Sequence, residues 1–381
     1  MRIGLISGEY PPMQGGVADF TRELGRAFVA QQHRIFVLTS RRGIGLDDPY
    51  VTVSPIVQNW NAASLRTVRR WIREKRLDVV NLQYQTAAYN MAGLIHLIPR
   101  LVCSVPVVTT FHDLRVPYLF PKAGRLREWV VRTLARDSDA VIVTNAQDEQ
   151  RLAREGIARV HRIPIGSNIE SSLPSDFDRS AWRVRFGVEP EEILVGYFGF
   201  VNHSKGVDTL LEALAQVRAD GMPLKLLMIG GRTGDSDPTN AAYARRIDDL
   251  IASLGLEKYV LRTGYVTPGE VSASFAACDL CALPYRDGVS FRRGSFMAAL
   301  AHGCPIITTS PAVPMPELAN KENVYLVAPG SVSGLAAALQ ILAEGLALRL
   351  RLAEGARALA EYFTWDRIAQ QTAALFAGLV K

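Results

Sequence analysis

Short apolar segments rich in β-branched residues alternate with longer, helix-like segments along nearly all of this 381-residue chain. This alternation is typical of parallel sheets, because each parallel strand must be reached by a crossover connection, usually a helix. The pattern occurs twice, before and after a loop rich in Ser, Asp and Pro at residues 166–178. The sequence therefore predicts an α/β protein made of two doubly wound, Rossmann-like domains that face a central cleft.

The apolar segments define the expected strands. In the first half they are Ile3–Ser7, Arg34–Thr39, Val51–Ser54, Val79–Leu82, Val105–Thr110, Ala140–Thr144 and Val160–Ile163. In the second half they are Ile193–Phe198, Leu224–Ile229, Val260–Gly264, Asp279–Pro284, Pro305–Thr309 and Asn323–Val327. We place the domains at residues 1–170 and 171–364, and we expect a helix at about 365–381 to pack back on the first domain.

Composition narrows the classes of partner. The net charge of +6 comes with no basic tail, which argues against a nucleic-acid-binding protein. The four cysteines lie in apolar surroundings, which suits packing residues of a reducing compartment, with a redox role for Cys278 and Cys281 as the alternative. The histidines show no metal-ligand spacing. The oligomeric state is not predicted by the sequence.

Hydropathy predicts a cytoplasmic protein. The apolar run at the N-terminus is short for a signal peptide, and none approaches the roughly 20 residues that span a bilayer. A basic, amphipathic helix is expected at Gly124–Asp137. It is interpreted either as an ordinary packed helix with a solvated basic face or as a peripheral contact with an anionic membrane.

Two glycine-containing loops in the second half follow expected strands and lead into helices. One contains Gly199, Asn202 and Lys205, and the other contains Asp287, Ser290, Arg292, Arg293, Gly294 and Ser295. Open α/β sheets bind ligands at the carboxyl ends of their strands, and helix N-termini and basic side chains attract anions. The loops therefore predict a phosphate-bearing ligand, although solvated surface cations are the ordinary alternative.

Two strand ends in the first half are further candidates. Gly15 and Gly16 lie between the first expected strand and a helix, where they expose backbone N–H groups, and the spacing is neither that of a dinucleotide fingerprint nor that of a P-loop. His112 follows another strand, from which it is expected to contact a ligand. The polar loop at Gly230–Asn240 is interpreted either as a loop that covers a ligand-binding site or as an ordinary solvent-exposed loop.

Taken in order, these residues resemble the retaining glycosyltransferases of family 4, which have the two-domain GT-B architecture. The resemblance covers nearly the whole chain. It is carried by Gly15-Gly16, Phe111-His112-Asp113, Ile163-Pro164-Ile165-Gly166, Gly199 with Lys205-Gly206, Thr263-Gly264-Tyr265-Val266, Ala298–Pro305 and Phe363-Thr364-Trp365-Asp366.

The resemblance implies transfer of a sugar from a nucleotide-sugar donor to a hydroxyl acceptor, without a bound metal or other cofactor. It implies that Gly16 faces the donor phosphates or the reacting centre, that His112 contacts the donor sugar and that Lys205 binds the diphosphate. Gly264, Tyr265 and Val266 are implied to lie beside the donor base. The expected acceptor is a carbohydrate, a lipid-linked sugar or a small molecule in polysaccharide, glycolipid or glycoconjugate synthesis.

The chain departs from the family pattern at the donor site. Phe200 stands where the family usually has an arginine, and Ser290 and Ala298 stand where it has paired glutamates. We expect Arg292 and Arg293 to replace the missing phosphate-binding cation. An active retaining transferase is the preferred interpretation, and a weakly active or inactive sugar- or nucleotide-binding subunit that partners an active transferase is the alternative. A phosphorylase of the same architecture is a third.

Overall fold

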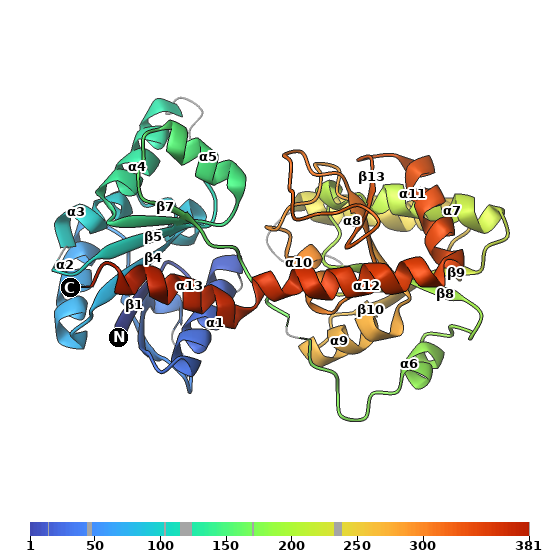
Figure 1. Ribbon diagram of the computed structural model, residues 1–381, viewed down its shortest axis with the longest axis horizontal. Helices are drawn as coiled ribbons and strands as arrows, with labels where there is room; N and C mark the ends of the chain where they lie inside the picture. Colours follow the sequence, from blue (N-terminus) through green and yellow to red (C-terminus); the bar gives the residue numbers. More distant parts are fainter. Residues whose placement is uncertain are drawn as a thin grey trace. The chain divides into compact units, whose positions relative to one another are not determined.

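The computed structural model describes residues 1–13, 15–43, 48–102, 104–114, 124–169, 171–231 and 238–380. The chain divides into two compact units (Figure 1). Unit 1 combines Met1–Asn168 with Phe363–Lys381, and unit 2 consists of Ile169–Tyr362. The C-terminal segment therefore belongs to the unit that contains the N-terminus.

Unit 1 contains a parallel sheet of seven strands in the order β3-β2-β1-β4-β5-β6-β7. Its strands are β1 (Arg2–Ser7), β2 (Arg34–Ser40), β3 (Thr52–Val57), β4 (Val79–Tyr84), β5 (Val107–Phe111), β6 (Ala140–Val143) and β7 (Val160–Arg162). Its α-helices are α1 (Gly16–Ala30), α2 (Ala62–Lys75), α3 (Ile98–Val102), α4 (Gly124–Asp137), α5 (Ala146–Arg154) and α13 (Trp365–Ala377).

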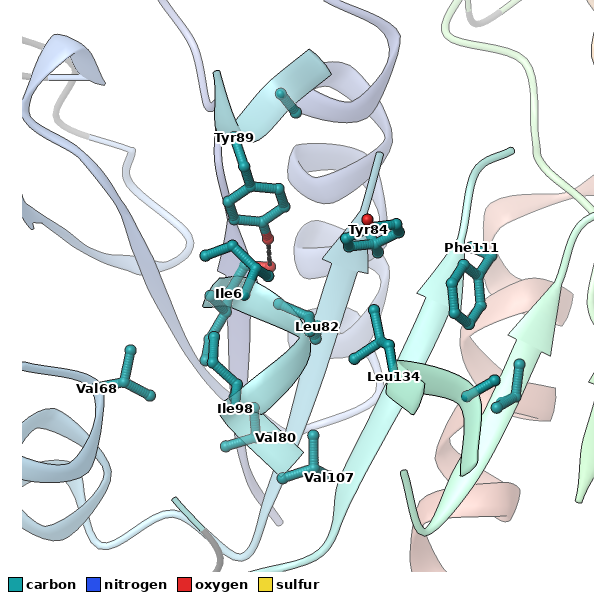
Figure 2. Packing of buried hydrophobic residues seen from close by; sticks show 14 of the residues in the cluster. Ile6, Val68, Val80, Leu82, Tyr84, Tyr89, Ile98, Val107, Phe111 and Leu134 are labelled. Carbon is teal, nitrogen blue, oxygen red and sulfur yellow. Dashed lines mark hydrogen bonds between the residues drawn. The ribbon is translucent and has the colours of Figure 1, made fainter. Parts of the chain in front are cut away.

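Apolar side chains cover both faces of this sheet. On one face, Leu82 and Phe111 pack with Leu134 of α4, and the hydroxyl of Tyr89 donates a hydrogen bond to the backbone carbonyl of Ile6 at 3.1 Å (Figure 2). Alternate strand residues point to the other face because the side-chain period of a strand is two. That face is covered by α1 and α13.

The C-terminal helix is held to unit 1 by packing and by specific hydrogen bonds. The rings of Phe28 in α1 and Phe376 in α13 have centroids 5.9 Å apart. The indole Nε1 of Trp365 donates to the carbonyl of Ser167 at 2.8 Å. A Cβ at Gly166 would lie 2.8 Å from that indole ring, so the chain passes closely beneath Trp365. These contacts explain why α13 closes the core of unit 1.

Unit 2 contains a parallel sheet of six strands in the order β10-β9-β8-β11-β12-β13. Its strands are β8 (Ile193–Phe198), β9 (Leu224–Ile229), β10 (Val260–Gly264), β11 (Leu280–Leu283), β12 (Ile306–Thr309) and β13 (Tyr325–Val327). Its α-helices are α6 (Arg179–Arg185), α7 (Val207–Ala219), α8 (Pro238–Ser253), α9 (Pro268–Ala277), α10 (Gly294–Ala301), α11 (Val332–Glu344) and α12 (Leu346–Ala360).

The structure confirms the fold class, because both units are parallel sheets with crossover helices. Each expected strand is present, with ends that differ from the expected ones by a few residues. Strand order places β8 at the centre of its sheet, with β9 on one side and β11 on the other. The loops after β8 and β11 therefore leave the same edge of the sheet, next to each other.

Candidate functional site

Three glycines mark the carboxyl ends of the neighbouring strands β8, β9 and β10. The N–H of Gly199 donates to the carbonyl of Ile229 at 3.0 Å, and Gly230 pairs with Gly264 across an isolated bridge. All three glycines have positive φ, at 111°, 107° and 71° respectively, which is a conformation that other residues rarely adopt. At Gly230 and Gly264 a Cβ would meet nothing closer than 3.8 Å, so a ligand can approach the backbone closely there, whereas the space beside Gly199 is taken by the side chain of Lys205.

Exposed aromatic side chains stand beside two of these glycines. Phe200 is 47% exposed and Tyr265 is 88% exposed, although large aromatic rings are usually buried. Beyond Tyr265 and the half-buried Val266, Thr267 forms a capping box with Glu270, which begins α9 and ends the loop. The edge thus offers flat apolar surfaces next to bare backbone, which suits a planar ring.

Lys205 lies in the loop after β8, and its ammonium group is the main uncompensated charge of this site. Its Nζ lies against Gly199, where any Cβ would overlap it. Burial, and then the positive charge of Arg293, lower the pKa of Lys205 to about 8. Across the described chain Lys205 has no carboxylate partner. Because desolvation without a counter-charge is unfavourable, this position favours an incoming anion.

Arg293 is fixed beside Lys205 by contacts on several sides. Its guanidinium pairs with Asp287, donates to Oγ of Ser204 at 3.2 Å and lies over the ring of Tyr285, 4.8 Å from the centroid. Asp287, a predicted donor-site residue, is thus the ion-pair partner of Arg293. Since that ion pair is neutral as a whole, Lys205 contributes the net positive charge.

The N-terminus of α10 completes this cluster. Ser295 is buried in the first turn, and its hydroxyl is hydrogen-bonded to the buried hydroxyl of Tyr285 at 2.7 Å. Gly294 leaves open space, because a Cβ there would meet nothing within 4 Å. The backbone N–H groups at this helix start add a partial positive charge. Tyr285 had no distinguishing sequence signal, since it reads as the end of an apolar strand.

The remaining predicted residues of the two loops, after β8 and after β11, differ in their contacts. Arg292 is half-buried and has interactions within the protein. The carbonyl of Ser290 accepts a hydrogen bond from the N–H of Arg293 at 3.0 Å, which forms the turn before α10. Asn202 caps the short turn at Lys205, and its side chain accepts from Ser204 Oγ at 2.9 Å. These two residues shape the loops that carry the cations.

Ala298 is fully buried in α10, with 0% of its surface exposed. The helix is apolar around it, from Phe296 to Leu300. The position where the related pattern has a glutamate is therefore a packing position in this chain.

In unit 1, His112 follows β5 and lies in a polar network. Its Nε2 is 2.9 Å from Oε1 of Gln83, and its ring packs edge-on against Phe20 with centroids 4.7 Å apart. Burial lowers the pKa of His112 to about 3, so the ring is neutral near pH 7. Gln83 was not predicted as a site residue, although a glutamine inside an apolar strand was a usable signal.

The Gly15-Gly16 turn is also described, and it is partly occupied by the protein itself. The carboxylate of Glu9 accepts backbone hydrogen bonds from Val17 and Ala18, at the start of α1. Burial raises the pKa of Glu9. A Cβ at Gly15 would overlap this carboxylate, whereas Gly16 has open space around it. The expected anion-binding N–H groups of this helix are thus in part satisfied by Glu9.

Other candidates from the sequence receive less support or lie outside the described chain. Residues 232–237 of the polar loop at Gly230–Asn240 lie outside the described residues. Cys281 and Cys304 are buried free thiols whose pKa values burial raises, which favours the packing interpretation over redox chemistry. Within the described ranges, no three His, Cys, Asp or Glu side chains form a metal-binding group, and no helix is long and apolar enough to cross a bilayer.

Two family models match the chain, one in each half. The first, described as a glycosyl transferase 4-like domain, matches residues 15–166. The second, described as glycosyl transferases group 1, matches residues 192–344. The chain is 28% identical to D-inositol 3-phosphate glycosyltransferase of Rhodococcus erythropolis, over 74% of this chain and 64% of that protein. It is 25% identical to glycogen synthase of Mycobacterium tuberculosis, over 99% and 94% respectively.

The match therefore spans less than two thirds of the length of the inositol phosphate glycosyltransferases. Solved structures show the same fold. HepE of Anabaena, solved in complex with UDP-glucose, has a TM-score of 0.75 at 22% identity over the whole of both chains. Sucrose-phosphate synthase of Thermosynechococcus elongatus has a TM-score of 0.75 at 22% identity, over 99% of this chain and 98% of the other.

The architecture is thus that of the GT-B glycosyltransferases. The chain belongs to glycosyltransferase family 4.

Proposed function

We propose that this protein transfers a sugar from a nucleotide-sugar donor to a hydroxyl group of an acceptor, with retention of configuration at the anomeric carbon. The observation that carries the proposal is the cation site of unit 2. Lys205 is desolvated, lies against Gly199 and has no acidic partner in the described chain. A nucleoside diphosphate supplies the counter-charge that this arrangement lacks.

The chemistry follows from where negative charge develops. As the bond between the sugar and the diphosphate breaks, charge accumulates on the leaving phosphate oxygens. Lys205, Arg293 and the N-terminus of α10 are already fixed before the reaction, so they stabilise that charge without reorganisation. We name no protein nucleophile, in keeping with a front-face route in which the donor phosphate assists the acceptor hydroxyl.

The bare edge at Gly230 and Gly264 is proposed to receive the nucleoside. Tyr265 and Phe200 offer exposed ring surfaces beside it, and the positive-φ glycines leave room for a ribose or base to approach the backbone. His112 of unit 1 is proposed to contact a hydroxyl of the donor sugar. The acceptor is proposed to be a carbohydrate, a lipid-linked sugar or a small molecule.

A second candidate function is a nucleotide- or sugar-binding subunit with little activity. It is favoured by Ala298, which is fully buried and has no group to bind ribose hydroxyls, and by Ser290, which replaces a carboxylate. The retained lysine and histidine favour the active enzyme instead, because both are desolvated at a cost that a purely structural residue need not incur.

The direct test is donor hydrolysis and transfer assayed with UDP-, GDP- and ADP-linked hexoses. An active enzyme turns over at least one donor, and Lys205→Ala lowers that turnover by about 10²-fold or more, since one charge-stabilising donor commonly contributes that much. Lys258→Ala, at an exposed lysine of the same unit, is the matched control and retains activity. Binding of a nucleotide without turnover of any donor supports the binding-subunit function.

A further inference from the structure

Two polar side chains are completely buried in the central strand of unit 1. Asn81 and Gln83 of β4 are both 0% exposed. As residues two apart on a strand, they point to the same face of the sheet, which is the face covered by α1 and α13. Buried amides in an apolar layer are costly unless every polar atom has a partner. Their hydrogen bonds therefore show which end of each side-chain amide is the oxygen and which is the NH₂ group.

The orientation of the first amide is fixed by a backbone group. The side-chain nitrogen of Asn81 donates to the carbonyl of Val108 at 3.0 Å and to Oγ1 of Thr110 at 2.9 Å. A backbone carbonyl can only accept a hydrogen bond, so this end of the Asn81 amide must be the NH₂ group. Oδ1 of Asn81 then points to Gln83.

The orientation of the Asn81 amide determines that of the Gln83 amide, which in turn determines the protonated nitrogen of His112. Since Oδ1 of Asn81 is an acceptor, Gln83 turns its NH₂ group to it, and that hydrogen bond is present. Oε1 of Gln83 is left to face His112 Nε2 at 2.9 Å. An acceptor can only be matched by a donor, so Nε2 of His112 carries the proton.

The other ring nitrogen of His112 is consequently unprotonated. The ring is neutral near pH 7 because burial lowers its pKa to about 3. The side chain is only partly exposed, and Nδ1 has no hydrogen-bond partner in the part of the chain that the structure describes. An imidazole in this state offers one lone pair and no proton at Nδ1.

We propose that Asn81 and Gln83 are positioning residues that hold His112 as the Nε2–H tautomer, so that Nδ1 is an obligate hydrogen-bond acceptor for a hydroxyl group of the sugar substrate. The identity of that hydroxyl as a sugar group rests on the proposed function, whereas the tautomer does not. A hydroxyl is selected because it can donate to Nδ1, and a group that only accepts hydrogen bonds is disfavoured.

The tautomer is tested directly by nitrogen NMR of protein labelled with ¹⁵N-histidine, which distinguishes the protonated from the unprotonated ring nitrogen. We expect a single Nε2–H form at His112, assigned by its absence from His112→Asn. Gln83→Met removes the acceptor at nearly constant volume, and Asn81→Leu removes the group that orients Gln83. Both are expected to yield a mixture of tautomers.

Two further variants separate positioning from general stabilisation of the core. Gln83→Glu in its protonated, buried form donates to Asn81 and accepts from His112, so it restores the Nε2–H tautomer. Thr110→Val removes the redundant acceptor of Asn81 while the carbonyl of Val108 still orients the amide, so it keeps the tautomer. A wild-type ring that is Nδ1–H or mixed, or a Gln83→Met ring unchanged from wild type, overturns the proposal.

The substrate contact is tested with deoxy analogues of whichever donor the wild type turns over. For one hydroxyl position, the wild type is expected to prefer the hydroxylated donor in kcat/KM by about tenfold, as for loss of one hydrogen bond. That preference is expected to shrink in Gln83→Met and to return in Gln83→Glu. Equal preferences in all three variants overturn the hydroxyl contact. An Nε2–H tautomer in a protein that turns over no donor overturns the proposed function but not the positioning by Asn81 and Gln83.

Discussion

The ammonium group of Lys205 lies against Gly199, in space that any side chain at position 199 would fill. The two residues come from the same loop after β8, and the positive φ of 111° at Gly199 makes room for the lysine. The backbone conformation of Gly199 therefore sets the position of the charge on Lys205.

Gly199→Ala is expected to displace Lys205 and to lower kcat/KM for the donor by roughly 10- to 100-fold, as for a small misplacement of a catalytic group. The matched control is Gly221→Ala. Gly221 has a similar positive φ of 88°, and a Cβ there meets nothing within 4 Å. Both variants incur about 1–3 kcal/mol of backbone strain. Equal loss of activity in the two would show that strain, not displacement of Lys205, is responsible.

The activity is expected to depend on pH through Lys205. In the free protein its pKa is lowered to about 8, so the ammonium is charged below that pH and loses its proton as the pH rises through it. Donor binding should therefore weaken on the alkaline side, and kcat/KM, which reports the free enzyme, should fall above pH 8 or so. Lys205→Arg remains charged and should move this fall to higher pH. An identical alkaline limb in Lys205→Arg would exclude Lys205 as its cause.

Removal of both arginines, in Arg292→Ala/Arg293→Ala, is expected to weaken binding of a nucleoside diphosphate by roughly 10- to 100-fold, as for loss of charge-assisted hydrogen bonds. A nucleoside without phosphates should be little affected. Arg293 should account for most of the effect, because Asp287 and Ser204 hold it beside Lys205. Calorimetry with both ligands checks this. Similar losses for the two ligands would indicate misfolding or a contact with the base.

Ala298→Glu is expected to destabilise unit 2 instead of restoring a ribose contact. The side chain would place a carboxylate at a position that is 0% exposed, in an apolar stretch of α10. An uncompensated buried charge costs about 3 kcal/mol or more, measured as a lower free energy of unfolding in denaturant. Ala252→Glu, at an exposed position of α8, is the control for helix propensity. Tighter donor binding by a stable Ala298→Glu protein, with strong selectivity for ribose over deoxyribose, would contradict this.

Helix α4 is expected to behave as a packed helix and not as a membrane anchor. Arg132, on its basic face, pairs with Glu155 of the same unit at 3.0 Å. Trp129 is 52% exposed and is the residue that most favours docking to a membrane. Sedimentation with anionic vesicles at low salt decides between the two. Salt-sensitive co-sedimentation that Trp129→Ala weakens would establish the membrane contact in place of the packed interpretation.

The sequence by itself predicted the fold and the family. Strands and helices are predicted by the local periodicity of apolar residues. The glycines and the lysine after β8 follow a predicted strand, where open α/β sheets bind their ligands, so they are recognisable as candidate binding residues. For the same reason His112 and Lys205 were recognisable as candidates. Their proposed roles remain predictions that the variants above test.

Only the tertiary structure decided how the candidates are partnered. Asp287 pairs with Arg293, and the carboxylate of Glu9 accepts hydrogen bonds from the N–H groups of Val17 and Ala18 at the start of α1. The series of hydrogen bonds from Asn81 through Gln83 to His112 links two neighbouring strands, and Gln83 and His112 are 29 residues apart in sequence. Such contacts depend on strand order and register, which bring distant residues within hydrogen-bonding distance. Local sequence patterns specify which elements form, but hydrogen bonds and charges act through space, so their partners are determined only when the sheet is assembled.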